Sequence, residues 1–576
     1  MFFGLIAGLL TWGVSGPAAA QPTSSARYWV TFRDKAGQTL RPAAYFSPQA
    51  QARRHRQHLP ACDSTDFPVR PDYLARVQAA TDTLTLVSRW FNAVSCRATP
   101  AQVVRLRQFP GIRAVVAWPE APLMVAARHS SGPAPKLAPR PLSAADQALA
   151  RQQTASLGAA DFRQAGLRGQ GLRIAIFDVG FNGTDTHPAF AHLRRRRAIV
   201  DTYDFLRRSP NVFRGGNHGT EVLSCIAGQL PDSTYLGLAD GAEFLLARTE
   251  QMFRERYAEE EAWLAAAEWA DRLGADIINS SLGYTDARYF PEQMNGRTSL
   301  VARAAELAVR KGMLVVNAAG NAGDDPAWHT VGTPADGDSV LAVGGLDPST
   351  YLHLDFSSYG PAPGGRLKPN VAAFGVAVTA VPGGFERTEG TSFASPLVAG
   401  FAACAWQQQR DLPVMALFAR LQQAGQLYPY FDYAHGYGLP QATYFTAGVA
   451  TAPTPTFDFV STDSVLSVII RPAAAFVPAR ALPLFADSVR VVGRGQPLLA
   501  AAAAGPANEA APELPPAPGP PAGFYWQLRD ARGQLVRYEV LEVSQRAVLR
   551  VPLAQVPPGG SVRVHYRGYT ASFPAL

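Results

Sequence analysis

Three short stretches of the sequence contain residues that together could activate a hydroxyl group. Gly390-Thr391-Ser392 is followed by a run of small and apolar residues that is typical of a helix, so Ser392 is expected at a helix N-terminus. Unpaired backbone N–H groups and the helix dipole favour negative charge there. Such a position suits a nucleophile whose attack creates an oxyanion. For this stretch alone, a capped buried helix with an inert serine is the alternative.

Asp178 and His218 are the residue types that a serine nucleophile requires. A serine hydroxyl needs a base to take its proton, and the imidazole needs a third group to hold it in the correct tautomer. Asp178 follows the apolar run 172–177, and His218 opens a small and apolar helical run that reaches Gly228. Each motif is weak alone, but an Asp, His and Ser within one predicted domain point to nucleophilic catalysis.

The elements that must position these residues are predicted by alternating patterns between residues 151 and 447. Short apolar runs suited to buried parallel strands are separated by helical patterns. The predicted strands are 172–177, 244–247, 277–278 and 314–316, and the predicted helices are 261–273 and 300–311. This order predicts an α/β domain with a doubly wound, mostly parallel sheet. Ligands bind such sheets at the carboxyl ends of the strands.

The region before this domain has a β-α-β-β-α-β pattern. The predicted strands are 28–32, 84–87, 91–95 and 112–118, and the predicted helices begin at Ser47-Pro48 and Thr99-Pro100. This order predicts a small ferredoxin-like α+β domain over residues 27–125.

The region after the α/β domain reads as a small β-sandwich over residues 455–576. Alternating patterns predict strands at 465–470, 489–492, 524–528, 548–551 and 562–566. The Ala/Pro-rich tract 500–521 is expected to stay outside the core as a loop.

The α/β domain resembles the subtilisin-like serine proteases, the subtilase family. The resemblance is carried by four motifs, 174–180 (IAIFDVG), 218–220 (HGT), 318–323 (AAGNAG) and 390–396 (GTSFASP). It implies that Asp178 orients His218, that His218 is the general base and then the acid, and that Ser392 forms an acyl-enzyme. Asn321 would bind the oxyanion together with the Ser392 N–H.

The resemblance also implies where a peptide substrate binds. Asn279-Ser280-Ser281-Leu282-Gly283 resembles the family's edge strand, which pairs with an extended peptide by β-augmentation. The implied substrate-binding residues are Ser281, Leu282, Gly283, Ala318, Ala319 and Gly320.

The resemblance gives roles to the remaining regions. Residues 27–125 resemble the propeptides of subtilases, which assist folding and inhibit the enzyme until cleaved, and 126–150 is the expected linker and processing region; a permanent accessory domain is the alternative. Residues 1–20 read as a signal peptide, with an apolar run before Ala18-Ala19-Ala20. The pattern at 529–536 resembles C-terminal sorting domains of the type IX secretion system. A sandwich that packs on the catalytic domain or binds substrate is the alternative.

No cofactor or metal is predicted. The short, proline-broken loop 229–234 replaces the Asn-rich loop that holds calcium in many subtilases. A structural calcium stays open as an alternative, but this loop does not support it. Asp185 and His187 could pass for a metal pair but lack further ligands in their loop. His329 and His435 are read as structural.

Charge and cysteine content limit the partners. The net charge is +8, but the densest basic run, 194–197, has no accompanying nucleic-acid motif, so we expect a solvated loop and no nucleic acid. No segment after the signal is long and apolar enough to span a membrane. Of the four cysteines, Cys62 and Cys96 could pair in an exported protein, whereas Cys225 and Cys404 are expected as buried thiols.

The sequence therefore predicts a serine endopeptidase, secreted or at the cell surface, with the periplasm as a further location. It is expected to be a monomer that is made as a self-processing proenzyme and acts on protein or peptide substrates, with its own propeptide as inhibitor. The alternative is a catalytically silent subtilase scaffold that acts as a binding protein.

Overall fold

The computed structural model describes residues 25–118, 141–251, 257–285, 288–447, 453–470, 489–494, 522–543 and 547–575. They form two compact units. The first contains residues 25–39 and 64–118, and the second contains residues 40–63 together with the described residues from 141 onward. The predicted signal peptide, most of the predicted linker and the tract 500–521 lie outside the described residues.

The first unit is an antiparallel sheet with two helices. Its strands are β1 (Ala26–Phe32), β2 (Thr83–Ser88), β3 (Ala93–Ala98) and β4 (Ile112–Ala117), in the order β2-β3-β1-β4. Its helices are α3 (Pro71–Ala80) and α4 (Pro100–Arg107). Apolar residues of the strands and of both helices form one core, in which Val30 and Val94 are fully buried. The predicted α+β architecture is confirmed.

One predicted helix has a different place in the fold. Ser47 caps α2 (Pro48–Arg56) as expected, but α2 belongs to the second unit. The helix that connects β1 to β2 within the first unit is α3, which the sequence reading missed. Tyr73 and Val77 of α3 pack in the core, whereas the buried side chains of α2 include Arg53 and Arg54. A helix that buries arginines needs acidic partners, and these come from the second unit.

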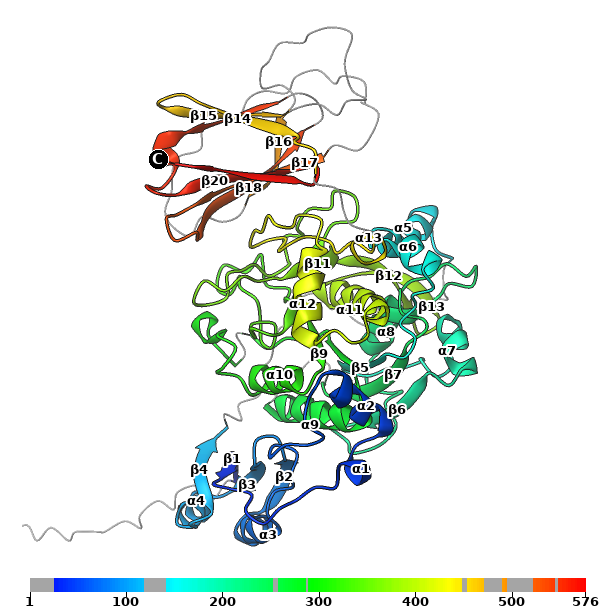
Figure 1. The fold of residues 1–576 in the computed structure, drawn as a ribbon. Helices are drawn as coiled ribbons and strands as arrows, with labels where there is room; N and C mark the ends of the chain where they lie inside the picture. Colours follow the sequence, from blue (N-terminus) through cyan, green and yellow to red (C-terminus); the bar gives the residue numbers. More distant parts are fainter. Residues whose placement is uncertain are drawn as a thin grey trace, which may run out of the picture. The chain divides into compact units, whose positions relative to one another are not determined.

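The second unit contains a parallel sheet in the order β11-β10-β9-β8-β5-β7-β6 (Figure 1). The strands are β5 (Arg173–Asp178), β6 (Ile199–Asp204), β7 (Glu243–Arg248), β8 (Ile277–Ser280), β9 (Leu314–Ala318), β10 (Leu341–Leu346) and β11 (Val371–Phe374). Every pair of neighbouring strands in it is parallel. Strands β5, β8, β9 and β10 are fully lined by buried residues, which explains their continuous apolar sequences.

Helices cover both faces of this sheet (Figure 1). They are α8 (His218–Ala227), α9 (Tyr257–Leu273), α10 (Leu300–Arg310) and α11 (Thr391–Gln408). Helices α8 and α11 pack against each other, as do α9 and α10. The predicted doubly wound α/β fold is confirmed.

Shorter elements surround this α/β layer. They are α1 (Pro42–Tyr45), α5 (Ala144–Ala155), α6 (Ala159–Gln164), η1 (Pro188–Phe190), α7 (Ala191–Arg195), η2 (Pro291–Gln293), β12 (Val376–Val381), β13 (Gly384–Glu389), α12 (Val414–Gln423) and α13 (Thr443–Thr446). Strands β12 and β13 form a hairpin that leads directly into Gly390. Helix α5, capped by Ser143, begins within the segment expected as linker.

The C-terminal region consists of two antiparallel sheets. One contains β14 (Phe457–Ser461), β15 (Val465–Ile470) and β19 (Val548–Pro552). The other contains β16 (Val489–Arg494), β17 (Ala522–Arg529), β18 (Leu535–Val543), β20 (Ser561–Tyr566) and β21 (Tyr569–Pro574), and η3 (Leu553–Gln555) follows β19. Leu466 and Val468 of the first sheet share a core with Phe524 and Val564 of the second. The predicted β-sandwich is confirmed.

The sandwich contacts the loop after α12. Tyr430, which is fully buried, packs with Tyr525 and Val540, and its hydroxyl donates to the carbonyl of Trp526 at 3.4 Å. Arg563 donates to the carbonyl of Pro429 at 2.9 Å. The sandwich thus packs against the α/β part of the unit.

The structure records Cys62, Cys225 and Cys404 as thiols. Cys62 carries a free thiol, so the Cys62–Cys96 pairing that the sequence allowed is not formed. Cys225 in α8 and Cys404 in α11 are fully buried thiols, and burial raises the pKa of both. Among the described helices, none combines the length and apolarity needed to cross a bilayer.

Candidate active site

Asp178 and His218 form a hydrogen-bonded pair at the carboxyl edge of the parallel sheet. Nδ1 of His218 lies 2.9 Å from Oδ1 and 3.1 Å from Oδ2 of Asp178. Asp178 ends β5 and is fully buried, and its Oδ1 also accepts the N–H of Val179 at 2.7 Å. Because Nδ1 faces a carboxylate, it carries the proton, and Nε2 keeps a free lone pair when the ring is neutral.

Glycine allows His218 to approach β5 closely. The N–H of Gly219 donates to the carbonyl of Gly180 at 3.0 Å. A Cβ atom on Gly219 would lie 2.6 Å from that carbonyl oxygen and 2.7 Å from the Phe181 ring. Any side chain here would push the start of α8 away from Asp178. This steric restriction explains why glycine follows the histidine in the His-Gly-Thr motif.

The environment of His218 changes its pKa. Burial lowers this pKa, but the Asp178 carboxylate and its hydrogen bond raise it by more, to about 9. The side chain is 27% exposed, so solvent still reaches one side of the ring. The imidazolium is therefore stabilised, and the neutral base is favoured only under alkaline conditions.

Ser392 lies in the first turn of α11, as predicted. Its exposed fraction is 9%, and Gly390 before the helix has φ 145°. A Cβ atom on Gly390 would lie 2.9 Å from Oγ of Ser392 and 3.4 Å from Nδ2 of Asn321. Both polar atoms thus approach one point that only glycine leaves open. The Phe393 ring lies 5.5 Å from the His218 ring, so this turn also contacts the imidazole.

Thr391 fixes the orientation of Asn321. Oδ1 of Asn321 accepts the N–H of Thr391 at 2.9 Å and its hydroxyl at 2.8 Å. The Thr391 hydroxyl also accepts the N–H of Gly320 at 3.2 Å. With the carbonyl oxygen engaged, the amide donors of Asn321 face Gly390 and Ser392. Thr391 belongs to the 390–396 motif, but the motif alone predicts no role for its side chain.

The predicted substrate-binding residues follow two neighbouring strands. Ser281, Leu282 and Gly283 come after β8, and the space beside Gly283 is open, with the nearest atom 4.0 Å from an added Cβ. Ala318 ends β9, and Ala319 and Gly320 follow it. The structure places both segments at the same edge of the sheet as Asp178, because β8 lies between β5 and β9.

Asn279 connects these segments to α11, a link that the sequence reading missed. Its Nδ2 donates to Oγ of Ser281 at 3.0 Å, and its Oδ1 accepts the hydroxyl of Ser395 at 3.0 Å. All three side chains are buried. The spacing of Ser395 from Ser392 places it one turn further along the helix, which is the signal that could have found it.

Glu221 is a second residue that the sequence reading did not single out. It lies one turn after His218 in α8 and accepts a hydrogen bond from the side chain of Asn217. Burial raises the pKa of Glu221 to about 7, with a further contribution from Glu386, although His218 lowers it. A carboxyl group that titrates near neutrality therefore lies beside the imidazole.

The other histidines and the basic run have structural contacts. Nδ1 of His187 accepts the N–H of Ala189, and Nε2 donates to the carbonyl of Gly384 at 2.9 Å, which uses both ring nitrogens. Arg194 donates to the carbonyl of His187 at 2.7 Å. The first half of the run 194–197 lies in α7, which the sequence did not predict, whereas Arg195, Arg196 and Arg197 are exposed to solvent as expected. Over the described residues, His, Cys, Asp and Glu form no group of three suited to a metal ion.

The fold and the site define an α/β protein of the serine-hydrolase class, and comparison with known proteins agrees. Residues 169–438 match the Subtilase family, and residues 27–131 match the Peptidase S8 propeptide domain of Bacteroidota. Subtilisin DY of Bacillus licheniformis is 31% identical over 41% of this chain and 77% of its own length. The chain therefore belongs to the subtilase family of serine peptidases.

Other relatives match only in part. Subtilisin-like protease SBT6.1 of Arabidopsis thaliana is 31% identical over 43% of this chain, but this covers only 22% of the plant protein. A cold adapted subtilisin-like serine proteinase of known structure has a TM-score of 0.39 and 22% identity, covering 49% of this chain and 91% of that chain.

Proposed function

We propose that the protein is an exported serine endopeptidase that hydrolyses peptide bonds through an acyl-enzyme and is made as a self-processing proenzyme. The observation that carries the proposal is the hydrogen bond between His218 and Asp178 at the sheet edge that also holds the first turn of α11. The match of residues 27–131 to a propeptide domain supports the proenzyme.

In the proposed mechanism, Nε2 of His218 takes the proton of Ser392 as Oγ attacks the carbonyl carbon of the substrate. Asp178 keeps the proton on Nδ1 and stabilises the imidazolium that forms. Nδ2 of Asn321 and the N–H of Ser392 donate to the oxyanion. His218 then gives the proton to the leaving amine, and water hydrolyses the acyl-enzyme by the same groups.

Substrate binding is proposed along the segments after β8 and β9. Ser281, Leu282 and Gly283 would pair with the extended peptide by main-chain hydrogen bonds, and Ala318, Ala319 and Gly320 would form the opposite wall. Small residues on both sides leave room for a large apolar side chain before the scissile bond.

Labelling with a serine-directed fluorophosphonate tests the proposal. The purified protein is expected to be labelled at Ser392 and to begin well after residue 118, which mass spectrometry of the mature N-terminus would detect. Ser392→Ala is expected to remain unlabelled and uncut, since loss of a triad serine costs about six orders of magnitude in turnover. A folded wild-type protein without label would instead indicate a silent scaffold that acts by binding.

A further inference from the structure

Residues 40–63 depart from the unit that contains their sequence neighbours. Both ends of this segment are joined covalently to the first unit, at Thr39 and Ser64, yet the segment itself packs in the second. It contains α1 and α2, and α2 lies beside α9 (Figure 1). We call residues 40–63 the anchor segment.

Two arginines of the anchor segment are buried on one aspartate. The side chains of Arg53 and Arg54 are 1% and 2% exposed, and Asp271 of α9 is 2% exposed. Arg53 contacts Oδ1 of Asp271, and Arg54 contacts Oδ2 at 3.0 Å. Arg53 also donates to the carbonyl of Ala275. Removing one partner of such a buried pair leaves an uncompensated charge, so the pairing holds the two surfaces together.

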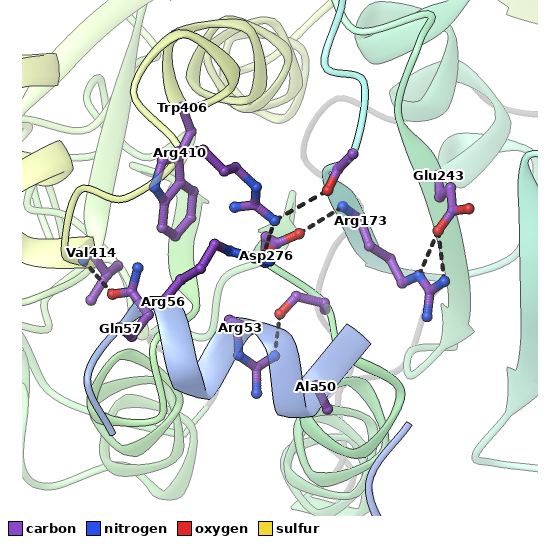
Figure 2. Close-up of polar contacts among 12 residues, drawn as sticks. Ala50, Arg53, Arg56, Gln57, Arg173, Glu243, Asp276, Trp406, Arg410 and Val414 are labelled. Atoms are coloured by element: carbon purple, nitrogen blue, oxygen red, sulfur yellow. Dashed lines mark hydrogen bonds and ion pairs between the residues drawn. The ribbon is translucent and has the colours of Figure 1, made fainter. Parts of the chain in front are cut away.

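Asp276 joins the anchor segment to the start of the sheet (Figure 2). Its Oδ1 lies 3.5 Å from Arg56 and 2.7 Å from Arg410, and its Oδ2 accepts the N–H of Arg173 at 3.0 Å. Asp276 directly precedes β8, and Arg173 begins β5. One carboxylate thus connects α2, the end of α11 and two strands.

Gln57 contributes a neutral, two-point contact. Its side chain donates to the carbonyl of Leu412 at 2.9 Å and accepts the N–H of Val414 at 2.7 Å. Figure 2 shows the contact with Val414, at the start of α12. Further along the segment, Asp63 pairs with Lys311 at 2.9 Å, and Lys311 is only 2% exposed.

The surfaces also fit closely. A Cβ atom on Gly274 would lie 2.5 Å from the backbone nitrogen of Ala50, and one on Gly312 would lie 2.9 Å from Cγ of Gln57. Both glycines have positive φ, at 82° and 86°. Each ends a helix of the catalytic layer and leaves room for the anchor segment.

This surface lies at the amino ends of the strands. Arg173 and Asp276 mark the starts of β5 and β8, whereas Asp178 and Ser281 lie at or beyond the ends of the same strands. A strand of this length spans about 17 Å, at about 3.3 Å per residue. The anchor segment therefore leaves the catalytic edge uncovered.

We propose that this surface is a second binding site for the propeptide, separate from the catalytic edge. The anchor segment would keep the propeptide bound to the enzyme after the chain has been cut in the predicted processing region. This binding would not depend on whether the catalytic edge is occupied. The inference uses the proposed function only in treating the predicted processing region, residues 126–150, as the region that is cut.

The test needs no catalytic activity. A site for a sequence-specific protease is placed within residues 126–140 of the full chain carrying Ser392→Ala, and the purified protein is cut by that protease. The amino-terminal fragment is expected to co-elute with the body in gel filtration. Immediate separation of the two would overturn the proposal.

Paired variants locate the binding site. Arg53→Ala with Arg54→Ala is expected to release the fragment about 10²-fold faster or more, as for other truncated buried charge pairs. Gln57→Ala is a milder variant for the case that the arginine variant does not fold, with about tenfold faster release expected. His55→Ala, exposed on the same helix, is the matched control and is expected to release the fragment at the wild-type rate. Equal release from Gln57→Ala and His55→Ala would exclude the anchor site.

Blocking the catalytic edge distinguishes propeptide binding at that edge from binding through the anchor segment. When the processed wild-type enzyme is labelled at Ser392 with a fluorophosphonate, the fragment is expected to stay bound. Its loss on labelling would mean that the catalytic edge alone holds the propeptide. Because the protease-cut Ser392→Ala protein does not depend on labelling, an inactive enzyme and a missing anchor give different results.

Discussion

The side-chain carbonyl of Asn321 accepts two hydrogen bonds from Thr391, one from its N–H and one from its hydroxyl, at 2.9 and 2.8 Å. Thr391 directly precedes Ser392 and is 1% exposed. We predict that Thr391 is a positioning residue, which turns the amide of Asn321 toward the proposed oxyanion.

Thr391→Val tests this relationship. The variant keeps the N–H contact but loses the hydroxyl, so we expect kcat to fall about tenfold with KM nearly unchanged. Asn321→Ala, which removes the donor itself, is expected to lower kcat by about 10²–10³. Steady-state kinetics on a peptide substrate provide both constants. Thr391→Ser should restore activity, and equal kcat values for the Val and Ser variants would argue against the role.

The raised pKa of His218 predicts an alkaline enzyme. Only the neutral imidazole can take the proton of Ser392, so kcat/KM is expected to rise with pH until about 9. The pairing of imidazolium with Asp178 stabilises the fold below the unfolded pKa of 6.5, and this contribution is lost as pH rises through about 9. As pH rises toward 9, activity is therefore expected to increase while the stabilising contribution of the His218–Asp178 ion pair is lost.

Asp178→Asn is the matched variant for the pH profile. Without the carboxylate, the pKa of His218 should fall, and the rise in kcat/KM should move to lower pH. Turnover should fall by about 10⁴ because the tautomer is no longer fixed, as in other triads. A profile that rises at the same pH in both proteins would show that His218 is not the titrating base.

Glu221→Gln is expected to stabilise the protein at alkaline pH. The pKa of Glu221 is raised to about 7 in the folded state, so its contribution to stability is complete below 4.5 and lost as pH rises through 7. Glutamine stays neutral and can still accept the hydrogen bond from Asn217. We expect a higher Tm at pH 9 but little change at pH 4.5, measured by thermal unfolding of the Ser392→Ala background.

The same substitution should also affect the imidazole. The Glu221 carboxylate contributes to the raised pKa of His218, so Glu221→Gln should move the rise in kcat/KM to lower pH. Glu389→Gln, exposed on β13, serves as the control and should leave both Tm and the profile unchanged.

Tyr525→Ala tests the contact between the sandwich and the α/β part. Tyr525 is 6% exposed and packs with Tyr430 at 5.8 Å between ring centroids. Removal of a large buried ring costs about 3–5 kcal/mol, so we expect a Tm lower by several degrees. Tyr444→Ala, at an exposed position on α13, is the control. An unchanged Tm in Tyr525→Ala would mean that the sandwich does not stabilise the enzyme.

The sequence predicts those parts of the fold in which the pattern of apolar residues along the chain matches the buried positions. The strands around Ile174, Phe244, Ile277 and Leu314 have continuous apolar runs because both faces are covered by helices. The positions of Ser392 and His218 in the first turns of their helices followed from the small residues after them. These features can be predicted because they depend on residues that are close together in the sequence.

The missed features depend on distant partners. Helix α2 reads as an ordinary polar helix, and its place in the fold is set by Asp271, more than 200 residues away in the chain. Strand β13 has no fully buried residue, so its pattern is weak. The hydrogen bond between Asn279 and Ser395 arises only when strand β8 and helix α11 meet in the fold.

Cys225 and Cys404 place a chemical reporter inside each of the two helices that begin at His218 and near Ser392. Maleimide can modify these thiols only when the helix that contains them is exposed, whereas Cys62 is reached without such opening. The delay before Cys225 and Cys404 are labelled, followed on their own peptides by mass spectrometry and so distinguished from Cys96, would thus time the opening of the two helices in the full chain, without any introduced probe.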